Sequence, residues 1–117
     1  MNEDKLSPQS LPSPMQYYAI GADDEIIKRF KLQLRSGETF SIPYSLLPIY
    51  ILTEGRELAI IAYELVIIIT GRNLDPIEEY LSKETLLWIK ESPSQKDDGQ
   101  SPIYISDIAI KGKAIRK

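Results

Sequence analysis

The feature that most constrains the fold is an alternation of apolar and polar residues on both sides of a glycine turn. Residues 30–35 alternate strictly, and residues 39–42 resume the alternation beyond Ser36-Gly37. A period of two places successive side chains on opposite faces of a β-strand, and glycine suits the tight turn between two strands. The sequence therefore predicts a β-hairpin over residues 28–43, with one face toward a core and one toward solvent.

Further strands are expected along the rest of the body. Residues 58–62 and 66–70 read as two strands joined at Tyr63-Glu64, and residues 66–69 are apolar on both faces. Such a strand is typical of the centre of a sheet, or of a small barrel closed against another layer. Pro43 and Pro48 make residues 44–52 an edge strand, a bend or a short irregular piece, because proline donates no ladder hydrogen bond.

The last third of the chain is expected to hold a short helix and a final hairpin. Asp75-Pro76 offers a capping residue followed by a proline suited to the first helical turn, and the helix should stop by Ser82-Lys83. Residues 86–90 and 103–110 read as strands around a polar loop at 92–102, which predicts a hairpin over residues 85–110. The alternation slips at Ser106-Asp107, so a bulge is expected there.

Composition excludes several kinds of function. The 117 residues include no Cys and no His, so there is no disulfide, no zinc site of Cys or His, no thiol nucleophile and no histidine general base. The acidic clusters lack the alternation of a calcium loop, and no glycine-rich phosphate loop occurs. We therefore expect a protein that is not an enzyme, with no catalytic residue, no metal and no cofactor.

The ends of the chain and its charge bear on domains and partners. Residues 1–14 read as a disordered Ser/Pro-rich tail, and residues 15–117 as one domain with a C-terminal extension at about 75–117. No signal peptide or membrane span is visible, so a cytoplasmic protein without a membrane partner is expected. The net charge of −3 argues against bulk attraction to nucleic acid, and no DNA partner is expected.

Two blocks resemble the two signature motifs of the Sm-like small β-barrel family. The first runs from Leu32 through Gly37 and onward to Ile51, and the second is Ile69-Thr70-Gly71 followed by Leu74. The resemblance covers residues 28–74. It implies a mainly β fold: a small, strongly bent antiparallel barrel, Sm-like or SH3-like, with one short helix and an extra C-terminal hairpin.

The departures from the family pattern concern its RNA pocket. The family's Asp and Asn fall on Pro48 and Leu52, its second-motif Arg falls on Thr70, and its second glycine falls on Ile42. Leucine has no hydrogen-bonding side chain, and threonine offers no planar cation. The resemblance therefore implies the fold and, residue by residue, argues against the usual site for single-stranded RNA.

Two functions remain open. The first is a non-enzymatic interaction or assembly module that binds protein, itself or another, through an exposed barrel edge, with a homo-oligomer as one form. The alternative is an RNA-binding Sm-like protein with a rearranged site. Its candidate contacts are Tyr44, expected to point outward, and Arg72 and Asn73, where a strand meets a turn. The alternative for Arg72 and Asn73 is a purely structural role in an ordinary turn.

Overall fold

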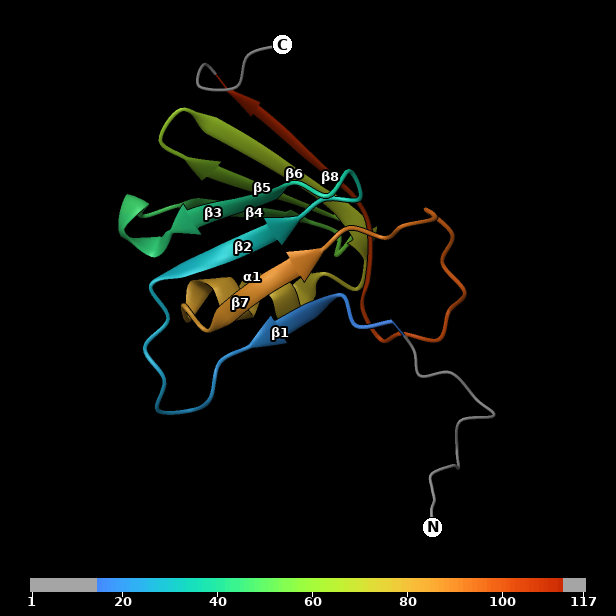
Figure 1. Ribbon diagram of the computed structural model, residues 1–117, viewed down its shortest axis with the longest axis horizontal. Helices are drawn as coiled ribbons and strands as arrows, with labels where there is room; N and C mark the ends of the chain where they lie inside the picture. Colours follow the sequence, from blue (N-terminus) through green and yellow to red (C-terminus); the bar gives the residue numbers. More distant parts are fainter. Residues whose placement is uncertain (1–14, 113–117) are drawn as a thin grey trace.

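Residues 15–112 are described by the computed structural model, which contains two four-stranded sheets and one helix (Figure 1). Sheet A has the order β1 (Tyr18–Ile20), β7 (Leu86–Lys90), β2 (Arg29–Gln33) and β3 (Thr39–Pro43). Sheet B has the order β4 (Ile49–Thr53), β5 (Glu57–Ala62), β6 (Leu65–Arg72) and β8 (Tyr104–Gly112). The helix α1 (Asp75–Ser82) lies between β6 and β7 in the chain. The mainly β class is confirmed.

The hairpin predicted around Gly37 is confirmed as β2 and β3. The two strands pair antiparallel, with Phe30 opposite Ile42 and Leu32 opposite Phe40. The Leu34 amide donates to the Glu38 carbonyl at 2.9 Å, and Gly37 takes a φ of 99° that favours glycine. Phe30 and Leu32 are fully buried, so the apolar half of the alternation does form the core side.

Both strands predicted around Tyr63-Glu64 are also present, as β5 and β6. Tyr63 turns the chain with a φ of 57°, and Ala62 pairs with Leu65. β6 lies between β5 and β8, which confirms its central position in the sheet. Residues 44–52 form a single 3₁₀ turn at Tyr44–Leu46 and then the edge strand β4, within the predicted options.

The predicted bulge is found in β8. Thr70 pairs with Asp107 and Gly71 with Ile105, which leaves Ser106 as the extra residue. A Cβ atom on Gly71 would lie 2.0 Å from the Tyr104 carbonyl oxygen, so the backbones of β6 and β8 approach too closely there for any side chain. The close approach at Gly71 and the bulge at Ser106 therefore occur at the same point of the β6–β8 pair.

A C-terminal hairpin over 85–110 was wrong. β7 enters sheet A between β1 and β2 and runs parallel to β2, whereas β8 pairs with β6 in sheet B. The reason is α1: after β6 it carries the chain from sheet B across to sheet A, and the 92–102 loop carries it back (Figure 1). A strand that arrives in this way can pair parallel, which a hairpin cannot.

The described residues form two open sheets and no closed barrel. Each sheet keeps two edge strands: β1 and β3 in sheet A, β4 and β8 in sheet B. The predicted antiparallel barrel is therefore not confirmed: the described strands form two open sheets, and one pair, β2 with β7, is parallel. The Sm-like resemblance stays a prediction.

The helix begins and ends close to the predicted positions. It spans Asp75–Ser82 with Pro76 in its first turn, but Leu74 is the N-cap and no side chain caps the helix. The capping role predicted for Asp75 was wrong, because the chain enters the helix one residue earlier, where the Leu74 amide donates to the Gly55 carbonyl at 2.8 Å. Ile77 and Leu81 are fully buried.

One strand was not anticipated. β1 has three residues and pairs with β7, with Tyr18 opposite Ile89. Three residues are too few to show a period in the sequence. The predicted tail, residues 1–14, lies outside the described residues, as do the last five residues of the basic C-terminus.

Candidate functional site

Tyr44 does not face solvent as predicted. It lies in the 3₁₀ turn after β3 and is only 3% exposed. Its hydroxyl donates to the Leu86 carbonyl at 2.9 Å, and its ring packs on Phe30 at 5.1 Å between centroids. Burial raises the pKa of the Tyr44 hydroxyl well above its usual range. Tyr44 is therefore a core residue that links β7 to β2, because its hydroxyl bonds Leu86 of β7 and its ring contacts Phe30 of β2.

Arg72 and Asn73 are both engaged by the loop at 92–102. Arg72 makes a bidentate contact with the Asp97 carboxylate and donates to the Ser101 carbonyl at 2.8 Å. The Asn73 amide donates to the Pro102 carbonyl at 2.9 Å, and Asn73 has a φ of 58°, as a turn residue does. Hydrogen bonds from Arg72 lower the pKa of Asp97. These contacts hold the loop to the end of β6.

The three predicted contact residues are not brought into one site. Tyr44 bonds the beginning of β7, whereas Arg72 and Asn73 bond the loop that follows the end of β7. One is a buried ring, and the other two are turn residues with protein partners. They form two separate structural contacts, one that holds β7 to the core and one that holds the 92–102 loop to the end of β6.

A buried carboxylate joins the two sheets. Glu91 is 8% exposed; its oxygens accept from the Arg35 amide at 2.8 Å and from the Ile108 amide at 2.7 Å. The Arg35 guanidinium reaches Glu91 at 3.2 Å and Asp107 at 2.9 Å. Arg35, the last residue of the alternating run at 30–35, is the cation of this junction. All the polar groups are satisfied by one another, so the junction is structural.

The outer face of sheet B is strongly apolar. The register places Ile49, Ile61 and Val66 in one row across β4, β5 and β6, and Ile51, Ala59, Ile68 and Ala109 in the next row. Their neighbours along the strands, such as Leu58 and Ile60, point into the core. We call these seven residues the aliphatic face. Polar residues border it: Lys111 at the end of the first row, and a third row of Thr53, Glu57, Thr70 and Asp107.

The aliphatic face is accessible. Ile49 is 60% exposed, Ile51 49% and Val66 38%. Strands about 4.8 Å apart and residues rising about 3.3 Å give the two apolar rows a flat area of about 220 Å². A contiguous group of exposed apolar residues with a polar border differs from apolar residues scattered singly over a surface, and marks a candidate interaction site. The apolar run at 66–69 was the sequence signal for it, because that run has no polar side of its own.

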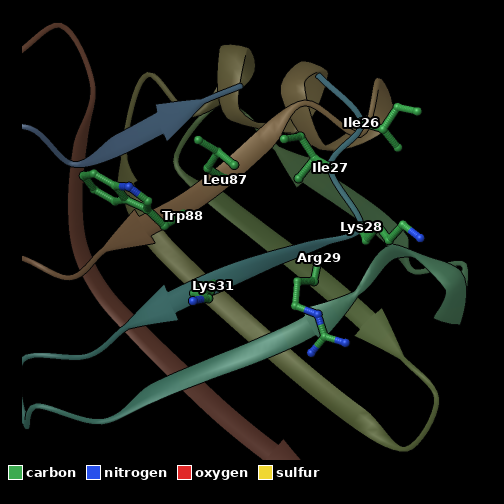
Figure 2. Close-up of a pocket in the computed structure, with 7 residues that line it drawn as sticks. All are labelled: Ile26, Ile27, Lys28, Arg29, Lys31, Leu87 and Trp88. Carbon is green, nitrogen blue, oxygen red and sulfur yellow. The ribbon is translucent and has the colours of Figure 1, made fainter. Parts of the chain in front are cut away.

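A second surface feature is a groove on the outside of sheet A. It has a volume of about 500 Å³ and is lined by Ile26, Ile27, Lys28, Arg29, Lys31, Leu87 and Trp88 (Figure 2). It opens where the β2–β7 ladder begins, at the pair of Lys31 and Trp88. No local sequence pattern indicates that Trp88 lies beside Lys31, because the two residues are far apart in the chain.

Neither a metal site nor a membrane-spanning helix is found within residues 15–112. Within residues 15–112 no three acidic side chains gather closely enough to hold a metal ion. The helix in this range is too short and too polar to cross a membrane.

Burial, together with the charges of Glu84 and Glu78, raises the pKa of Tyr50 to about 12, which reflects its place at the core side of β4.

Comparisons with protein-family models, with curated proteins and with solved structures found no match for this chain. Its function is therefore argued from its own surfaces.

Proposed function

We propose that this protein is a non-enzymatic assembly module that associates with a second copy of itself through the aliphatic face of sheet B. The observation that carries the proposal is the uncovered set of seven aliphatic side chains on that face. The sequence analysis expected association through a strand edge. The face supports the proposal better, because burying apolar area is the main driving force of association.

A second copy suits this face for two reasons. Two flat sheet faces pack well against each other at about 10 Å, and a two-fold axis makes any such face its own partner. A standard interface buries about 800 Å² on each partner. The two apolar rows, about 220 Å² of flat area, would form its apolar centre. The polar row and the exposed turn residue Tyr63, 82% accessible, would form the rim.

The single-stranded RNA alternative has no described contact in its favour at the predicted residues. Tyr44 offers no exposed ring for a base, and Arg72 and Asn73 already bond the 92–102 loop. We therefore propose the assembly role alone.

Sedimentation velocity over a wide range of concentration tests the proposal. The wild-type chain should move from monomer to dimer as its concentration rises. Ile51→Lys should weaken the dimer by about tenfold or more, because it places a charge within the buried aliphatic face. Ile26→Lys is the matched control, since Ile26 is 84% exposed and lies outside the aliphatic face. A chain that stays monomeric throughout, or two variants that weaken equally, would contradict self-association.

A further inference from the structure

The groove on sheet A has two chemically different walls. Figure 2 shows Lys28, Arg29 and Lys31 along one wall, from β2 and the residue before it. Ile27, Leu87 and Trp88 line the opposite wall. The three basic residues are exposed, whereas Leu87 and Trp88 are half-buried. The groove is therefore amphipathic across its width.

The charge of the groove is of one sign. Three of the seven described residues that line it are cations and none is acidic. Arg29 is oriented by a hydrogen bond to the Ser41 hydroxyl at 3.2 Å, from the neighbouring strand β3. A ligand that fills the groove should therefore carry negative charge along one side.

The remaining lining selects among anionic ligands. Four of the seven residues are aliphatic or aromatic, and Trp88 is the single ring. A bound single strand of nucleic acid stacks successive bases on several aromatic rings. A short segment with apolar side chains on one side and carboxylates on the other needs only one ring and fits both walls.

We propose that the groove binds an extended acidic peptide in which aliphatic side chains alternate with carboxylates. In an extended chain, alternate side chains point in opposite directions, so one set meets Trp88 and Leu87 while the other meets Lys31 and Arg29. The volume of about 500 Å³ is in the range of sites for ligands of this size. This site lies on sheet A and is independent of the association proposed for sheet B.

Trp88 makes the test specific, because it is the only tryptophan of the chain. The probe is a synthetic peptide of alternating Leu and Glu, which has no fluorescence of its own. Its titration into the full chain should change the Trp88 emission saturably, and added salt should weaken the binding. Anisotropy of the same peptide carrying a dye gives a second readout that does not depend on Trp88.

Variants and matched peptides then test the contribution of each wall to binding. Lys31→Gln should weaken binding about fivefold, whereas Lys111→Gln, the same charge change on sheet B, should leave it unchanged. A peptide with Ser in place of Leu should bind more weakly, and one with Lys in place of Glu should not bind.

Four results would overturn the proposal. They are the absence of saturable binding, equal weakening by both lysine variants, equal binding of the Ser peptide, and tighter binding of an oligouridine RNA of similar length. The last result would assign the groove to nucleic acid.

Discussion

The two sheets differ most on the faces that they turn to solvent. The outer face of sheet A carries Arg29, Lys31, Ser41 and Thr39, each exposed. The outer face of sheet B carries the aliphatic face instead. Both sheets bury their inner faces in the same core. The difference therefore lies in what each sheet meets on its outside.

This contrast separates a face whose exposed strands carry polar residues that water can solvate from a face that is stable only under a second apolar layer. A sheet with one solvated face needs polar residues at alternate positions, as β2 has. β6 lacks them over residues 66–69, yet the described chain covers only one side of it. An apolar strand of this kind is stabilised when a second layer covers it, and the association that we propose would supply that layer. Sheet A is complete without one.

The largest expected effect tests how rigidly sheet B is fixed. Gly71→Ala should destabilise the fold by about 4 kcal/mol, because the new Cβ would lie 2.0 Å from a backbone oxygen of β8. Gly37→Ala, in the turn of the sheet A hairpin, has open space around it and should cost about 1 kcal/mol for its positive φ. Urea unfolding of both variants measures the difference. Equal losses in the free energy of unfolding would show that the backbones of β6 and β8 can move apart to admit the new Cβ atom.

The next effect concerns the junction between the sheets. Glu91→Gln removes the buried charge that accepts from Arg35 and Ile108 and turns a donor toward their amides. We expect a loss of about 2–3 kcal/mol in the free energy of unfolding. Glu38→Gln, an exposed site in the sheet A turn, should change it by less than about 0.5 kcal/mol. A Glu91 variant as stable as this control would mean that packing alone holds the sheets together.

The smallest expected effect tests the loop that returns the chain to sheet B. Arg72→Ala should speed amide exchange over residues 92–102 while leaving the urea midpoint almost unchanged, because the Arg72–Asp97 ion pair is accessible to solvent. The folded pKa of Asp97 is lowered by Arg72, so the stabilising contact is complete above the unfolded pKa of about 4. It is lost as the pH falls through the lower folded value. Equal amide exchange rates of residues 92–102 in wild type and variant would show that Arg72 does not hold the loop in place.

Much of the local structure could be predicted from the sequence. The hairpin at Gly37, the strands around Tyr63-Glu64, the bulge at Ser106 and the end of α1 all follow from short-range patterns. These features depend on period and turn chemistry, which a few neighbouring residues fix. The expected site could not be predicted in this way. An exposed-looking tyrosine, an arginine and an asparagine each have partners more than 20 residues away in the chain.

The sequence by itself determined where the longer strands run and which of their sides are apolar, because side-chain alternation is a local property of the backbone. Only the tertiary structure decided which strands become neighbours. It placed β7 beside β2 and so set Trp88 against Lys31, and it left the second apolar side of β6 uncovered. The physical reason is that strand order depends on how α1 and the 92–102 loop carry the chain between sheets. Contacts far apart in sequence fix that path, and no local pattern encodes it.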